Sequence, residues 1–343
     1  HVIVHSFPTR RSSDLADHEK AKSIAEQLIG RISDLDVLCG HRVHVGIAVC
    51  AILRPDHRLL AEADLALRQA QSQSHSGWKL YQEGDVLQVA REARQWYATL
   101  NRVLQERSLM LHFQPMFHVD HDTTQICEVF CRITMHKQIV SAGIFLPMAE
   151  RFGLAVSFDR MILEEIHRYA EQQKGAMSFC VNLSPQTLLH HEFLGWLDKW
   201  LAERPGFSSR LIVETSEYLV RTGGAQVDQL CKLLHRHKVK LSLDHFGVHS
   251  GAFGYLRSLP LNFLKIDRSF IRGIHQDKDN QFYVQSMIQI AHSCDVTVFA
   301  EGVELQEEWE CLQALGIDGG QGYFLGRPNA ELSSARTVVS VNN

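Results

Sequence analysis

Eight short apolar runs between residues 109 and 330 constrain the fold more than any other feature of the chain, because each one carries polar residues toward its end. The runs are LHFQP, ICEVFCRI, SFCVNLS, RLIVETSE, KLSLDHFG, NFLKIDRS, VTVFAEGVE and GGQGYFLG. Segments with the apolar spacing of amphipathic helices lie between them, for example FDRMILEEIHRYAEQQ and QVDQLCKLLHRH. This alternation predicts an α/β fold, a (β/α)8 barrel similar to a TIM barrel.

The polar residues of these runs are expected at one mouth of the barrel, because the carboxyl ends of parallel strands meet there. In chain order they are Gln114, Glu128, Arg132, Asn182, Glu214, Asp244, His245, Lys265, Asp267, Glu301, Glu304 and Gln321. Several carboxylates at one mouth would repel one another unless cations were bound, and acids with an amide suit Mg²⁺ or Mn²⁺. Arg132 and Lys265 carry charges that suit a phosphate. The pattern predicts a metal-assisted hydrolase.

The same blocks resemble the EAL domain, whose members hydrolyse cyclic di-GMP to linear pGpG with two divalent metals. The resemblance covers Leu109 to about Pro328, and LKIDRSFI and AEGVE stand at the family's spacing within it. It implies a first metal site formed by Glu128, Asn182, Glu214 and Asp244.

The resemblance also implies roles for the remaining polar residues. Lys265 and Glu301 would position or deprotonate the attacking water, with Asp267 and Glu304 supporting them. A purely structural role of Asp267 and Glu304 in setting loop geometry stays open. Contacts with the dinucleotide would come from Gln114, Arg132 and Gln321.

The chain departs from the family at His245, which stands where the family has a second carboxylate ligand of the second metal. Imidazole suits zinc, copper or iron better than Mg²⁺, so the second metal site is expected to be weak. Val248 and His249 replace a threonine and a glycine of the family pattern, and the family uses this loop for the metal site and for pairing subunits. Homodimer formation through this domain is therefore in question. Two alternatives stay open for His245: it binds Mn²⁺, or it hydrogen-bonds Asp244 or a backbone group.

We expect an EAL-type cyclic di-GMP signalling domain in which hydrolysis is weakened or lost. A module that binds the nucleotide without turnover is a second hypothesis. The third is an inactive interaction protein that acts on a protein partner and resembles CsrD-type regulators, which control the decay of small regulatory RNAs. The blocks CEVFCRI, NQFYVQS and GIDGGQG carry that likeness, but those regulators have lost more of the catalytic set than this chain has.

The N-terminal part has a different pattern. Residues 1–15 contain FPTRRSSDL, which back-translates to a common sequencing adapter, so we leave them out of the fold prediction. Residues 16–84 predict a small α+β piece whose end, LAEADLALRQAQSQSHSGWKLYQ, resembles the last third of a GGDEF (diguanylate cyclase) domain. The GTP-binding loop of that family is absent, so cyclase activity is not expected. Residues 85–108 predict a connecting helix, and residues 331–343 form a tail.

Composition excludes some classes of protein. A formal net charge of -4 predicts no direct binding of nucleic-acid polymers. The longest apolar run, Val45 to Leu53, is shorter than the ~20 residues that span a bilayer, so this part is expected in the cytoplasm. A membrane anchor upstream of residue 1 stays open. The eight cysteines include no CxxC pair, which predicts buried thiols and no disulfides or zinc site.

Overall fold

The computed structural model describes residues 22–24, 26–27, 44–47, 77–80, 85–120, 126–173, 177–248 and 253–332. The chain divides into two compact units, residues 1–98 and 99–343. In the first unit, the parallel strands β1 (His44–Ile47) and β2 (Gly77–Leu80) precede the helix α3 (Asp85–Glu106), which continues into the second unit. The helix α3 accounts for the predicted connecting helix. The GGDEF-like segment LAEADLALRQAQ and residues 1–15 lie outside the described residues.

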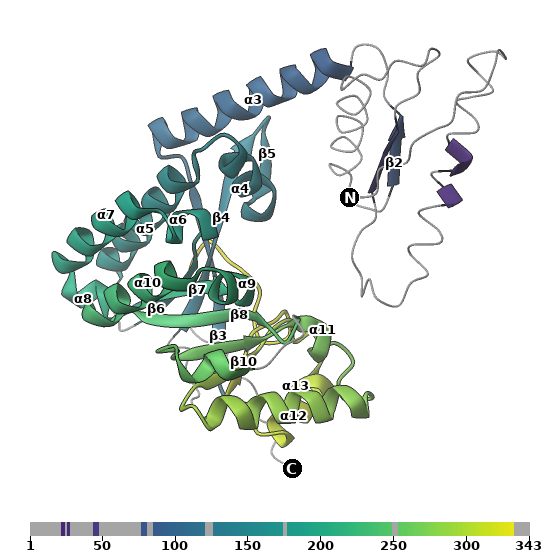
Figure 1. Ribbon diagram of the computed structural model, residues 1–343, viewed down its shortest axis with the longest axis vertical. Helices are drawn as coiled ribbons and strands as arrows, with labels where there is room; N and C mark the ends of the chain where they lie inside the picture. Colours follow the sequence, from purple (N-terminus) through teal and green to yellow (C-terminus); the bar gives the residue numbers. More distant parts are fainter. Residues whose placement is uncertain are drawn as a thin grey trace. The chain divides into compact units, whose positions relative to one another are not determined.

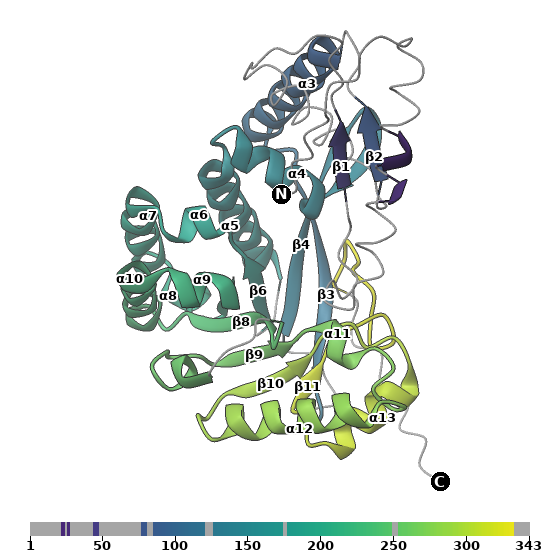
Figure 2. The same ribbon diagram turned by 45° about the vertical axis from the view of Figure 1, so that its right-hand side comes forward.

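Eight strands of the second unit close into a barrel (Figures 1 and 2). They are β3 (Met110–His118), β4 (Ile126–Met135), β6 (Ser178–Asn182), β7 (Leu211–Ser216), β8 (Lys240–Phe246), β9 (Phe263–Ile266), β10 (Thr297–Ala300) and β11 (Gly319–Gly320). The barrel closes because β3 pairs with both β4 and β11. A further strand, β5 (Gln138–Ser141), pairs with the distal part of β4. The predicted eight-stranded barrel is confirmed.

The predicted regular alternation of strand and helix was wrong at the start of the barrel. The strand β3 runs antiparallel to both of its neighbours, and only residues 119–125 connect it to β4. A link of this length joins antiparallel strands, whereas parallel neighbours need a crossover of a dozen or more residues. The parallel strand and helix repeat therefore begins with β4.

Helices and short turns of helix cover the outside of the barrel (Figures 1 and 2). Their bounds are α4 (Ala142–Arg151), α5 (Ala155–Gln172), α6 (Pro185–Leu188), α7 (His191–Ala202), α8 (Pro205–Ser208), α9 (Glu217–Thr222), α10 (Gly224–Arg236), η2 (Phe253–Arg257), α11 (Arg268–Ile271), α12 (Lys278–His292) and α13 (Gln306–Ala314). In α5, the residues Phe158, Ile162, Ile166 and Ala170 are all buried. Their spacing of four places them on one face of the helix, which packs on the barrel.

The lower part of the barrel is filled by a layer of side chains, Met116, Cys180, Ile212, Phe263 and Phe299. This layer makes the barrel a packed core and not a pore, so the site above it has a closed floor. Four cysteines of the described residues, Cys127, Cys131, Cys180 and Cys231, are buried free thiols, as predicted.

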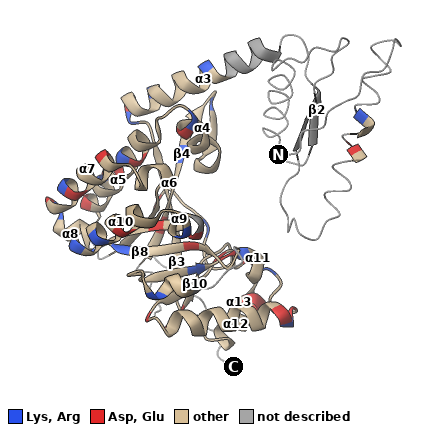
Figure 3. Cartoon of the chain, viewed as in Figure 1, with Lys and Arg blue, Asp and Glu red and all other residues tan. Residues whose placement is uncertain are grey.

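The outer helices α5 and α7 carry charges of both signs (Figure 3). These charges form ion pairs, such as Arg168 with Glu165 at 2.6 Å. No helix in the described ranges has both the length and the apolar character that crossing a membrane requires.

Candidate functional site

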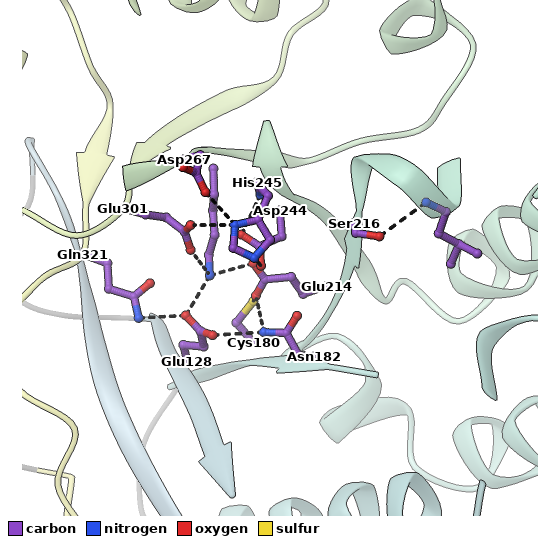
Figure 4. Close-up of polar contacts among 12 residues, drawn as sticks. Glu128, Cys180, Asn182, Glu214, Ser216, Asp244, His245, Asp267, Glu301 and Gln321 are labelled. Carbon is purple, nitrogen blue, oxygen red and sulfur yellow. Dashed lines mark hydrogen bonds and ion pairs between the residues drawn. The ribbon is translucent and has the colours of Figure 1, made fainter. Parts of the chain in front are cut away.

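All of the predicted polar residues except Arg132 and Glu304 lie in one contact network inside the mouth of the barrel, which Figure 4 shows without Gln114. At one edge of this network, Gln321 Nε2 donates to Gln114 Oε1 at 3.0 Å and to Glu128 Oε2 at 2.8 Å. Next, Asn182 Nδ2 donates to Glu128 Oε1 at 3.0 Å and to Glu214 Oε2 at 3.4 Å. The fold thus brings together side chains from all eight strands or strand ends of the barrel.

Strand register explains the contact of Asn182 with Glu214 and the common direction of Gln114 and Glu128. Asn182 is the register partner of Glu214 in the parallel pair β6 and β7, and Gln114 is the partner of Glu128 in the antiparallel pair β3 and β4. Register partners project to the same face of a sheet, so both pairs face the inside of the barrel, where Asn182 contacts Glu214 and Gln321 bridges Gln114 and Glu128. The prediction that every site residue ends a strand was wrong for Gln114 and Glu128, which lie within strands. They reach the site because β3 runs antiparallel and β4 continues beyond the barrel to pair with β5.

Lys265 is the central cation of the network. Its Nζ lies 2.6 Å from Glu214 Oε1, 2.7 Å from Glu128 Oε2 and 3.3 Å from Glu301 Oε1. Burial lowers the pKa of Lys265, but the three carboxylates outweigh burial and raise the pKa well above its ordinary value. Lys265 is therefore protonated, and its single charge faces three acids.

Burial also acts on two of these acids. It raises the pKa of Glu214 and of Glu301, while Lys265 acts in the opposite direction on both. A carboxyl with a raised pKa holds a proton more readily than a solvated one, which suits proton transfer.

His245 lies at the top of the network, where its imidazole is surrounded by acids (Figure 4). Its Nδ1 lies 2.8 Å from Asp267 Oδ2 and 3.8 Å from Glu301 Oε2, and its Nε2 lies 3.4 Å from Asp244 Oδ2. The hydrogen bond to Asp267 raises the pKa of His245, and although partial burial lowers it, Asp244 and Glu301 add to the rise, to about 9. The ring is thus an imidazolium at neutral pH. Of the alternatives for His245, hydrogen bonding to an acid is observed, but the ring's nearest partner is Asp267 and not Asp244.

The backbone at His245 has φ of 54°, in the left-handed region that few non-glycine residues adopt. The neighbouring Asp244 accepts the His245 backbone N–H at 2.8 Å, which supports this conformation. Val248 is exposed, and His249 lies outside the described residues.

Four residues of the network carry oxygen atoms that could bind a divalent cation. Glu128, Asn182, Glu214 and Asp244 offer carboxylate and amide oxygens, the ligands that Mg²⁺ and Mn²⁺ prefer. The acids of the network outnumber its two cations, Lys265 and His245. The formal charge of the network is therefore negative. One ligand atom each from Asp244, His245 and Glu301 also lies within 4.8 Å of the other two. The residues fit a first cation, while the imidazolium takes up part of the space and charge available to a second.

Two residues of the site, Cys180 and Glu217, were missed from the sequence. Cys180 Sγ donates to Glu214 Oε2 at 3.0 Å, and it could have been found because it lies two residues before Asn182, on the same face of β6. Glu217 Oε1 accepts the Tyr255 hydroxyl at 2.8 Å, and Glu217 Oε2 accepts the Gly247 N–H at 3.4 Å. Glu217 therefore anchors the loop that follows His245.

Arg132 and Glu304 lie apart from the network in the part of the chain that the structure describes. Arg132 is partly exposed on the distal half of β4, opposite Met110 and Ser141. Glu304 has an exposed side chain, and its backbone N–H donates to Glu308 Oε2 at 2.9 Å. Their predicted roles in substrate binding and catalysis remain predictions.

Comparison with known proteins shows relatives that share this site's fold. The bifunctional diguanylate cyclase/cyclic di-GMP phosphodiesterase MucR of Pseudomonas aeruginosa is 29% identical over 319 residues, 90% of this chain and 46% of MucR. The RNase E specificity factor CsrD of Escherichia coli is 24% identical over 317 residues, 89% of this chain and 48% of CsrD. The chain thus spans about half the length of these two relatives.

A solved structure of the MucR phosphodiesterase in complex with c-di-GMP superposes with a TM-score of 0.62 at 29% identity. It covers 68% of this chain and 97% of that structure's chain. The family model of the EAL domain matches residues 98–328, which include the whole barrel and the entire contact network. The chain therefore belongs to the EAL domain family.

Proposed function

We propose that this chain binds cyclic di-GMP through its EAL domain and hydrolyses it to linear pGpG at a strongly reduced rate. The observation that carries this proposal is the imidazole of His245, which lies among Asp244, Asp267 and Glu301. The chain belongs to a family of cyclic di-GMP phosphodiesterases, and MucR, with which it shares the fold, is described in complex with c-di-GMP.

The retained residues support binding and a first cation. Glu128, Asn182, Glu214 and Asp244 would hold Mg²⁺ or Mn²⁺, which would supply charge stabilisation at the phosphate and lower the pKa of a bound water. Glu301 lies at the rim of the same network with a raised pKa, which suits a group that accepts a proton from the attacking water. The ammonium of Lys265 holds Glu301, Glu128 and Glu214 in place.

His245 weakens the second cation position for two reasons. An imidazolium repels a dication, and it occupies the carboxylates of Asp267 and Asp244 that would otherwise attract one. It also supplies one positive charge where a dication supplies two. If the second cation contributes several kcal/mol, its loss slows hydrolysis on the order of 10² to 10⁴-fold, at 1.36 kcal/mol per decade.

A regulator without turnover is the second candidate function. The likeness to CsrD extends over 89% of this chain, and the same His245 contacts favour a loss of hydrolysis. Against it stand Glu128, Asn182, Glu214 and Lys265, which are joined by a series of contacts, and Asp244, which is also present.

The test is to incubate the purified full chain with cyclic di-GMP and either Mg²⁺ or Mn²⁺. Nucleotide binding is followed by calorimetry, and pGpG release by chromatography. Binding with slow release supports the proposal. Binding without release selects a sensor, and the absence of both selects an interaction protein. Release at the rate of a relative with two aspartates at this position would contradict the role assigned to His245.

A further inference from the structure

Ser184, at the turn between β6 and α6, is held by two acids that lie outside the network described above. Its backbone N–H donates to Asp159 Oδ2 at 3.0 Å, and its Oγ donates to Glu150 Oε1 at 2.6 Å. Asp159 belongs to α5 and Glu150 to α4, so residues of two outer helices hydrogen-bond to one residue of the turn. We call Ser184, Asp159 and Glu150 the serine clamp.

The clamp differs from ordinary helix capping. Ser184 stands at the N-cap of α6, where a serine usually accepts a hydrogen bond from a backbone N–H of its own helix. The Ser184 side chain makes no such cap bond and is used for Glu150 instead. The turn is therefore tied to the outer layer of the barrel and not to the short helix that follows it.

Asp159 is an unusual residue for this position. Its side chain is fully buried, a rare state for an aspartate unless a partner compensates for the lost water. Burial raises its pKa to about 7, although Thr187 and the Ser184 N–H lower it, and no cation of the described residues contributes to its pKa. A buried carboxyl without a cation destabilises the fold by itself, so the contacts of Asp159 with Thr187 and with the Ser184 N–H of the turn offset its burial.

The turn leads directly to the site. Asn182 ends β6, and its exposed side chain contacts Glu128 and Glu214 at distances of 3.0 and 3.4 Å. Two residues later the chain reaches Ser184, which is buried and donates its backbone N–H to Asp159 of α5. Asn182 thus lies between the paired residues of β6, which precede it, and the serine clamp, which follows it. The strand pairing and the clamp together set the direction of the Asn182 side-chain amide.

We propose that Asp159 and Glu150 are positioning residues that hold Asn182 in the candidate metal site through Ser184. The proposal rests on the proposed function, because Asn182 is the neutral ligand of the first cation there. Groups that orient a metal ligand from outside typically change metal affinity by about 10 to 100-fold when they are removed. We therefore expect Asp159→Ala to weaken Mn²⁺ binding about 10-fold.

The experiment uses the full chain and Mn²⁺ alone as the probe, with free Mn²⁺ measured by electron paramagnetic resonance. Hydrogen exchange of the segment 182–188 is measured by mass spectrometry in the same samples without metal. Asp159→Ala should weaken Mn²⁺ binding and speed exchange in this segment. Asp159→Asn keeps an acceptor oxygen for the Ser184 N–H and should restore most of the affinity.

Asp198→Ala is the matched control, because it removes a contact between α7 and α10 that is remote from the turn. Asp198 Oδ1 lies 3.0 Å from Arg236 Nη1 and 2.6 Å from His237 Nε2. This variant should lose stability without a change in Mn²⁺ affinity or in exchange at 182–188. A purely structural role of Asp159 predicts the same outcome for both alanine variants.

A second route avoids dependence on the folding of Asp159→Ala. Ser184→Ala and Glu150→Ala remove the same Oγ contact, so the double variant should bind Mn²⁺ no worse than either single variant. Additive losses of Mn²⁺ affinity in the double variant would overturn the proposed role of the serine clamp. Unchanged Mn²⁺ affinity and hydrogen exchange in the two single variants and the double variant would overturn it as well. If the unaltered chain bound no Mn²⁺, the proposed function would fail, and the exchange rates at 182–188 would still decide whether the clamp holds the turn.

Discussion

Replacing His245 with aspartate should strengthen the second cation position, which we propose is weak in this chain. The network holds five acids, Glu128, Glu214, Glu301, Asp244 and Asp267, and two cations, Lys265 and His245, for a formal charge of -3. His245→Asp exchanges a positive for a negative charge and brings the formal charge to -5. One additional dication restores the original value. The backbone does not oppose the change, because aspartate tolerates the left-handed region in which His245 lies.

The size of the effect follows from the chemistry of paired cations. If the second cation supplies several kcal/mol at the transition state, Mg²⁺-dependent pGpG release should rise on the order of 10² to 10⁴-fold. In the absence of metal the variant should be less stable, because it loses the 2.8 Å contact between His245 Nδ1 and Asp267 and adds a like charge. Added Mg²⁺ should then raise the melting temperature of the variant more than that of the unaltered chain.

The assay combines pGpG release with calorimetric titration of Mg²⁺, which counts the bound ions directly. His292→Asp is the matched control, since His292 Nε2 lies 2.8 Å from Asp318 Oδ2, outside the site. That variant makes the same chemical change beside an acid and should alter neither the number of bound ions nor the rate. A folded His245→Asp protein that binds one more Mg²⁺ but gains no rate would refute the link between the imidazole and slow hydrolysis.

Three further variants test other parts of the site. Lys265→Met leaves buried acids without their cation and should lower the free energy of unfolding by about 3 to 5 kcal/mol, measured by urea denaturation. The folded-state pKa of Asp159, about 7, lies above its ordinary value of 3.8, so its contribution to stability is present below pH 4 and is lost as pH rises through 7. As pH rises from 4 to 8, the melting temperature of Asp159→Asn should therefore increase relative to that of the unaltered chain. Arg132→Ala should weaken cyclic di-GMP binding and leave Mn²⁺ affinity unchanged, which calorimetry checks; weaker Mn²⁺ binding would place Arg132 in the metal site.

Much of the barrel could be predicted from local pattern. Strand and helix periodicity are properties of neighbouring residues, and each of the eight predicted runs forms a strand of the barrel. Strand direction is not a local property. Nothing in the run LHFQP distinguishes an antiparallel strand from a parallel one, and the short link to β4 was the feature that mattered.

For the site, too, local sequence predicted one part and tertiary structure decided the other. Residue types and their order along the strands predicted a mouth rich in carboxylates, but register decided which of them meet. Asn182 and Glu214 face each other because β6 and β7 pair in that register, and Cys180 enters the site from the same face of β6.

By itself, the sequence determined the barrel, and it predicted a set of oxygen ligands in which His245 replaces an acid. Only the tertiary structure decided that Lys265 neutralises Glu128, 137 positions away, and that the His245 ring pairs with Asp267, 22 positions away. The physical reason is range: periodicity and residue chemistry act over a few positions, whereas charge compensation depends on which strand ends the closed barrel brings within hydrogen-bonding distance.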